Sequence, residues 1–202
     1  MLIAIVVGTV LAFGWGAVSW TTGIYDFAIK PLPGGDGLAA TFESASAADG
    51  AYIYPAPPAT AVMTGQQSTI ATNAMTGQQS TIATNAFREE HRKGPLMLVL
   101  LRREGVDPMS PTVLVRGFMI ELFGTGLLAA IIAVACKFGA RLQDRLALGI
   151  VVPAFAMLSS HAVVWNFFHL PDSFSMVLFI DGMIAWTLSG LACALIIKPA
   201  RR

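Results

Sequence analysis

Four long apolar stretches limit what this chain can fold into. They occupy residues 1–21, 113–136, 146–168 and 174–197. A helix that crosses a hydrocarbon core about 30 Å thick needs roughly 20 consecutive apolar residues, and each stretch reaches that length. Only 12% of the 202 residues are charged, whereas an ordinary soluble domain has roughly a quarter. The sequence therefore predicts an all-α membrane protein with four transmembrane helices.

The first stretch could be confused with a secretory signal. It has no basic residues ahead of it and no small-residue cleavage site before a polar boundary. Both features are typical of signal peptides. We therefore expect residues 1–21 to be a retained transmembrane helix.

The basic residues of the short connections predict the orientation. They are Lys137, Arg141 and Arg145 in the loop 137–145, and Lys198, Arg201 and Arg202 in the tail 198–202. The short turn 169–173 has no Lys or Arg. Because cytoplasmic loops carry the excess of basic residues, we expect both termini in the cytoplasm of a bacterium, the helices in its inner membrane and residues 22–112 in the periplasm.

The external segment has structural signals at both ends. Residues 40–55 indicate a short helix that runs into a strand, and residues 94–111 indicate a strand that ends in a turn. Residues 51–54 can pair with 96–101. We expect a small external α/β elaboration between the first two transmembrane helices.

A perfect tandem repeat lies inside this segment. Residues 63–86 read MTGQQSTIATNA twice, within a stretch, 55–93, that is too polar to bury a core. We expect 55–93 to be a disordered insert and 87–94, FREEHRKG, to be a charged turn. A neutral expansion of a surface loop is the favoured interpretation, because each doubling of a loop's length adds only about 0.6 kcal/mol to the entropy cost of closing it. An adhesive or partner-binding repeat is the alternative.

Three ionisable residues lie inside the predicted helices: Glu121, His161 and Asp181. At 1.5 Å per residue, each falls about 12 Å below the external surface. Small residues follow the two acids at steps of four, on stripes that allow close helix packing. These packing residues are Thr125, Ala129 and Ala133 after Glu121, and Ala185, Ser189 and Cys193 after Asp181.

Several interpretations of this polar layer stay open. It could be a structural hydrogen-bonded network, a proton or cation relay, a metal site, or three unconnected side chains. The metal ligands are unknown, since no diagnostic ligand spacing is present. Axial ligation of a haem by His161 alone is a further possibility, but we expect no cofactor.

Other functional classes lack their motifs. The sequence has no phosphate-binding loop, nucleophile elbow or metalloprotease helix motif. A net charge of +1 gives no reason to expect nucleic acid. Cys136 and Cys193 lie near the predicted cytoplasmic ends of their helices, so we expect reduced thiols rather than a disulfide.

The order of several motifs resembles a group of small bacterial inner-membrane proteins. The motifs are FGWGAVSW, GAYIYP, GPLMLVLLRREGVDPMSP and FIDGMIAWTLSGLACALIIKP. The resemblance covers most of the chain except residues 55–93. It implies an inner-membrane protein with an external segment between its first two helices, and it brings no activity with it.

The combination of packing stripes, an external segment and no catalytic set favours a non-catalytic accessory or assembly subunit of a larger membrane complex. A small proton- or cation-coupled carrier is the first alternative, with Glu121, His161 and Asp181 as its coupling residues. A metal-dependent membrane enzyme is the second. The expected partners are the lipid bilayer and either other membrane subunits or further copies of the chain.

Overall fold

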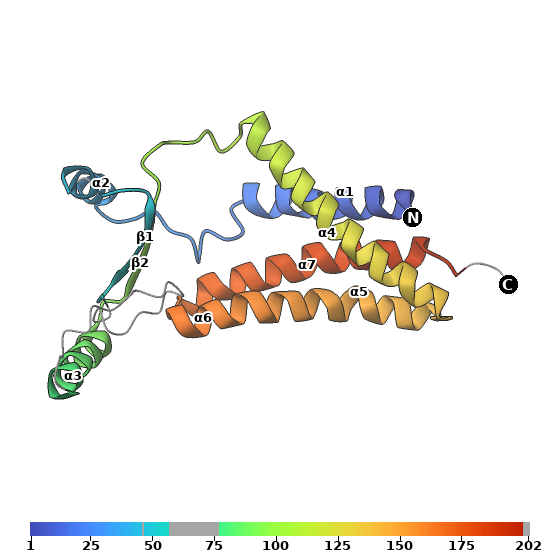
Figure 1. Ribbon diagram of the computed structural model, residues 1–202. Coiled ribbons are helices and arrows are strands. Elements are labelled where there is room, and N and C mark those ends of the chain that lie inside the picture. Colours follow the sequence, from blue (N-terminus) through green and yellow to red (C-terminus); the bar gives the residue numbers. More distant parts are fainter. Residues whose placement is uncertain (46, 57–76, 200–202) are drawn as a thin grey trace. The chain divides into compact units, whose positions relative to one another are not determined.

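The computed structural model describes residues 1–45, 47–56 and 77–199. The chain divides into two compact units, which we describe separately. One combines Met1–Gly35 with Val106–Arg202 and holds the long helices, and the other is Asp36–Gly105. Figure 1 labels the elements of both.

Four helices of the first unit are long and apolar enough to cross a membrane. They are α1 (Leu2–Thr21), α4 (Pro111–Lys137), the continuous helix Leu142–Phe168 and α7 (Asp172–Ile196). The third of these consists of α5 (Leu142–Met157), the π-helical turn η1 (Leu158–Ala162) and α6 (Val163–Phe168). For the described residues, the predicted set of four apolar helices is confirmed.

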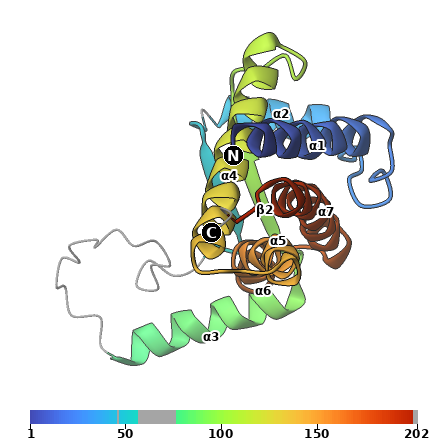
Figure 2. The same ribbon diagram turned by 90° about the vertical axis from the view of Figure 1, so that its right-hand side faces the viewer.

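Helix α7 is the centre of this unit. It packs against α1, α5 and α4, and α4 also crosses α1. Figure 2, which looks along the helices, shows α7 between α1 and α5. A side chain on α7 can therefore contact several neighbours at once.

Helices α5 and α7 approach backbone to backbone at two glycines. A Cβ atom on Gly149 would lie 2.8 Å from the carbonyl carbon of Gly190, and one on Gly190 would overlap the Gly149 carbonyl oxygen. Pro153, which is buried within α5, has no N–H with which to bond that oxygen. The contact depends on both glycines having no side chain.

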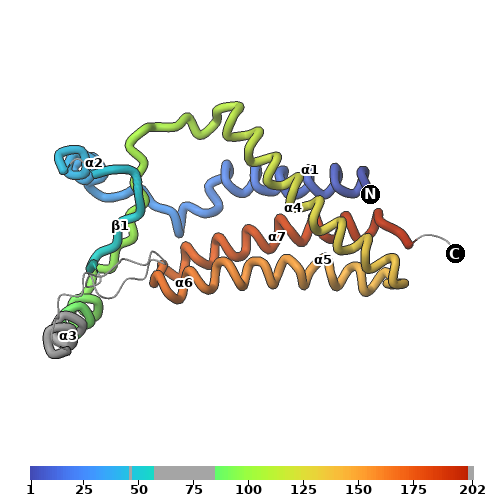
Figure 3. Tube along the Cα trace, in the orientation of Figure 1, coloured from blue at the N-terminus to red at the C-terminus, as the bar shows by residue number. Residues whose placement is uncertain are grey.

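The start of α1 and the end of α7 lie at the same end of the unit, as Figure 3 shows. The Cys193 thiol there donates to the Ala4 carbonyl oxygen over 3.6 Å. Apolar residues from α1, α4 and α7 form the buried core around this contact. Cys136 and Cys193 are both buried and free.

Arg145 differs from its predicted place in a cytoplasmic loop. Helix α5 begins at Leu142, where the Arg141 backbone N–H donates to the Asp144 carboxylate over 2.7 Å. Arg145 is consequently helical and only 7% exposed. Its guanidinium donates to the carbonyl oxygen of Ile197, just past the end of α7. The charge that we assigned to the loop instead caps a helix C-terminus.

The second unit contains α2 (Gly35–Ser44), β1 (Gly50–Tyr54), α3 (Gly77–Lys93) and β2 (Met97–Leu101). The two strands pair antiparallel, with Gly50 opposite Leu101 and Tyr54 opposite Met97. The predicted strand pair is thus confirmed. The Phe42 ring of α2 contacts the Tyr52 ring, with centroids 6.0 Å apart.

Helix α3 corrects the prediction of a charged turn at 87–94. The helix continues to Lys93, and Gly94 follows with φ +65°. An ion pair of 2.8 Å joins Arg92 to Glu89 one turn earlier, and three basic residues occupy the last turn, which favours a helix C-terminus. Of the predicted disordered insert, 77–93 is therefore helical. Residues 57–76, which include the whole first repeat copy at 63–74, lie outside the described residues.

Candidate functional site

The carboxylate of Asp181 accepts four hydrogen bonds from one short segment of the chain. Its Oδ1 accepts from Trp15 Nε1, Ser19 Oγ and Tyr25 OH, each over 2.8 Å. Its Oδ2 accepts from Trp20 Nε1 over 2.9 Å. We call these five residues the Asp181 cluster.

The geometry of α1 explains why these donors converge. Trp15 and Ser19 are four residues apart and so share one helix face, which faces α7. After α1 ends at Thr21, Gly23 adopts a left-handed conformation with φ +73°. The chain then returns, and the Tyr25 ring packs edge-on against the Trp20 ring. The Asp181 cluster thereby fixes both the last turns of α1 and the segment that follows.

The donors determine the chemistry available to Asp181. All four are neutral N–H or O–H groups, and an ionised carboxylate is an acceptor-only group with room for about four such bonds. Both of its oxygens are engaged. This arrangement suits a fixed anchor that joins α1 and the segment after it to α7.

Tyr25 lies outside the long helices, next to this charge. Partial burial raises the pKa of the Tyr25 phenol above its ordinary value of 10.0, and the hydrogen bond to Asp181 and the negative charge there raise it further. The phenol therefore remains a donor throughout the neutral range.

Glu121 lies on α4, which packs against α7, the helix that carries Asp181. Its side chain is partly buried, and its Oε2 atom has no hydrogen-bond partner among the described residues. The two predicted carboxyl groups therefore lie on neighbouring helices. They differ sharply, because one is fully bonded and the other is not.

His161 lies in η1, where its Nδ1 atom is 2.8 Å from Ser160 Oγ. Ser160 Oγ also donates to the Ala156 carbonyl oxygen over 2.6 Å. Within the described residues, no hydrogen bond or ion pair joins His161 to Glu121 or Asp181. A layer that includes His161 therefore stays a prediction.

The small residues below the carboxyl groups lie in the helix interfaces. Thr125 Oγ1 and Ser189 Oγ are 2.9 Å apart in a buried hydrogen bond between α4 and α7. Gly8 of α1 fits against both, since a Cβ there would lie 2.8 Å from the Thr125 methyl. Ala129, Ala185 and Cys193 are buried, and Ala133 packs on the core from the side.

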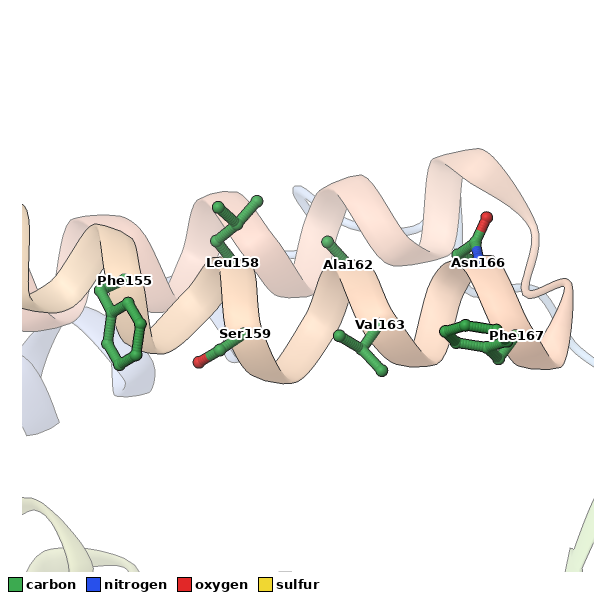
Figure 4. A pocket seen from close by; sticks show the side chains of 7 residues that line it. All are labelled: Phe155, Leu158, Ser159, Ala162, Val163, Asn166 and Phe167. Carbon is green, nitrogen blue, oxygen red and sulfur yellow. The ribbon is translucent and has the colours of Figure 1, made fainter. Parts of the chain in front are cut away.

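A shallow hollow of about 360 Å³ lies on the outside of the third long helix. Figure 4 shows its side chains along one face. They are Phe155, Leu158, Ser159, Ala162, Val163, Asn166 and Phe167. None of them belongs to the Asp181 cluster, so the hollow and the polar residues are separate features.

The described residues contain no group of three or more His, Cys, Asp and Glu side chains able to hold a metal ion. The metal-dependent alternative therefore has no ligand set in this part of the chain. Comparisons with protein-family models, curated proteins and solved structures gave no match.

Sequence reasoning found Asp181 but missed its four donors. The motif FGWGAVSW places a Trp and a Ser four residues apart near the end of the first helix. That spacing signals a shared polar face on an apolar helix.

Proposed function

We propose that this protein is a non-catalytic accessory or assembly subunit of a larger membrane complex, with Asp36–Gly105 as its docking unit. One observation supports this most strongly. All the buried hydrophobic core residues lie in the other unit, within the described part of the chain. The docking unit therefore presents apolar strands that it does not cover.

The exposure of the strands is extensive. All five residues of β1 are exposed, and Leu100 of β2 is 77% exposed. Among the described elements, only β1 and β2 pack substantially on one another in this unit. An isolated two-stranded sheet is marginally stable in water, so a covering partner would stabilise it. Large exposed apolar patches are typical of interaction sites.

We further propose that the four long helices lie in a bacterial inner membrane with both termini in the cytoplasm. The contact between Cys193 and Ala4 supports termini on the same side. The Lys and Arg residues of the short connections support the cytoplasmic side. The docking unit would then be periplasmic.

The Asp181 cluster has a clear role in such a protein. It ties the segment that leaves α1 to the central helix α7, through four hydrogen bonds. This segment leads directly into the docking unit. A fixed attachment point restricts the freedom of the unit and so lowers the entropy cost of binding a partner.

Native electrophoresis of membranes solubilised in a mild detergent tests the docking role. Replacing Ile53 and Leu100 together by Thr makes the strands more polar. Replacing both by Val is the matched control, because Val has nearly the same shape as Thr but no hydroxyl group. We expect the wild type and the Val pair to migrate as a large assembly and the Thr pair to migrate as a small species. Equal migration of the Thr and Val pairs would refute the docking role.

A carrier is the second candidate, because Oε2 of Glu121 is buried without a hydrogen-bond partner among the described residues. Unpaired carboxyl groups inside a membrane commonly mark proton or ion pathways. Purified protein in liposomes would show a proton or cation flux that Glu121→Gln abolishes. A flux that is absent, or that Glu121→Gln leaves unchanged, would remove the carrier from consideration.

A further inference from the structure

Strand β2 has an outer edge that no described segment covers. The described sheet has two strands, so each strand pairs on one side only. Natural proteins protect such edges with charged residues, proline or bulges, because unpaired main-chain groups recruit other strands. The β2 sequence, MLVLL, has no charge and no proline, and its pairing register with β1 is continuous. This edge is therefore suited to receive another strand.

We propose that two copies of the protein join through this edge, with β2 of each copy paired antiparallel about a two-fold axis at Val99. Symmetry then sets every contact. Val99 lies opposite its own copy, Leu98 opposite Leu100, and Met97 opposite Leu101. All five pairs are apolar, so the strand is complementary to itself.

The pairing also extends an existing apolar face. Directly opposite residues of an antiparallel pair lie on the same face of the sheet. Ile53 lies opposite Leu98 within one copy, and Ala51 lies opposite Leu100. In the dimer Leu98 and Leu100 lie beside Leu100 and Leu98 of the second copy, and Ile53 and Ala51 continue the same face on the outer strands. A four-stranded sheet with one continuous apolar face results, and four strands support a sheet that two strands do not.

The charges that flank β2 permit this arrangement. Continuing the register outward places Arg102 opposite Leu96 and Arg103 opposite Pro95. Glu104 falls opposite Gly94. No two like charges lie directly opposite one another, which is the arrangement that destabilises antiparallel pairs. The choice of a second copy as the occupant rests on this charge compatibility together with the self-complementary strand.

Cysteine cross-linking of the full chain in its membrane tests the register. In the dimer the two Val99 positions have Cβ atoms about 4.5–5.5 Å apart. The two Ile53 positions are three strand spacings apart and offset by two residues along the strand, which gives about 16 Å. We expect Val99→Cys to form a disulfide-linked dimer on mild oxidation and Ile53→Cys to stay at background. The parent chain, whose own cysteines are buried, sets that background. Equal cross-linking at both positions, or none at Val99→Cys, would overturn the proposal.

A charge exchange gives an independent test. Leu98→Lys with Leu100→Lys places like charges opposite one another across the two-fold axis, whereas Leu98→Lys with Leu100→Glu places opposite charges there. We expect dimer dissociation at about a tenfold lower concentration for the Lys–Glu variant than for the Lys–Lys variant. The Glu–Glu variant should behave like Lys–Lys. Identical behaviour of all three variants would contradict the pairing.

The two proposals can fail separately. The dimer rests on β2 alone and goes beyond the accessory role, so a chain that cross-links at Val99→Cys but binds no other subunit would keep the dimer and lose that role. A chain that binds other subunits without this cross-link would do the reverse.

Discussion

Replacing Asp181 by Asn would remove the charge from the centre of the Asp181 cluster and keep one acceptor oxygen. Trp15, Ser19 and Tyr25 donate to Oδ1 and would then donate to a neutral amide oxygen. The NH₂ group would replace Oδ2 and would face the Trp20 N–H, so that one bond is lost. The shape of the side chain changes little, which makes the variant a test of charge and hydrogen bonding.

The expected loss follows from the number of bonds. A hydrogen bond to a charged group contributes about 1.5–3 kcal/mol and a neutral one about 0.5–1.5, so each of three partly buried donors loses about 1 kcal/mol. Trp20 is 49% exposed, and water can replace its bond. The free energy of unfolding should therefore fall by about 3 kcal/mol. For a chain of this length that lowers Tm by about 6–12 °C.

The protein supplies its own reporter for this assay. Cys136 and Cys193 are buried and free, so a thiol-reactive fluorescent dye will label them only when the helices separate. Ser19→Ala is the matched control, because it removes one donor and leaves the other three, at a cost of about 1 kcal/mol. If Asp181→Asn were no less stable than Ser19→Ala, the cluster would not anchor α1 as we describe.

Three further predictions use the same dye assay. Gly149→Ala should destabilise the protein by about 1–3 kcal/mol through overlap with the α7 backbone, whereas Gly126→Ala, which has open space around it, should be neutral or stabilising; equal effects would refute the close contact. Arg145→Met should lower the free energy of unfolding by about 1.5–3 kcal/mol, because the carbonyl oxygen of Ile197 loses a charged donor. An unchanged Tm would contradict that role. The pKa of Tyr25 is above 10.0 in the folded protein. Its contribution to the free energy of unfolding is therefore complete below pH 10 and is lost as the pH rises past the folded pKa. Tm measured from pH 8 to 11 should therefore fall at the alkaline end in the wild type and fall less in Tyr25→Phe, and parallel curves would refute the Tyr25 contact.

The long helices could be predicted because their signal is local. An apolar run of membrane length is visible without knowledge of any neighbour, and α1, α4 and α7 begin and end within two residues of the expected positions. Strand pairing was predictable for a similar reason, since only two β-rich stretches are available. Helix α5 began earlier than expected because the contact between Arg141 and Asp144 continues the helix into a charged sequence.

The contacts of the polar residues were harder to predict, because the rotation of each helix depends on its neighbours. Asp181 was recognised because a carboxyl group is costly in an apolar helix. Its contact with Tyr25 was not predicted, because the turn at Gly23 that brings Tyr25 to Asp181 has no apolar pattern. His161 lies in a π-helical turn, which shifts the helix register beyond it. A projection at 3.6 residues per turn therefore cannot place His161 relative to Glu121.

Purification of the tagged protein at its native expression level, followed by mass spectrometry of the proteins that remain attached, tests the accessory role most directly. A mild detergent that preserves membrane complexes is required. We predict a reproducible set of larger membrane subunits in addition to the chain itself. Recovery of the chain alone, or only with further copies of itself, would contradict the accessory role and favour transport that depends on Glu121.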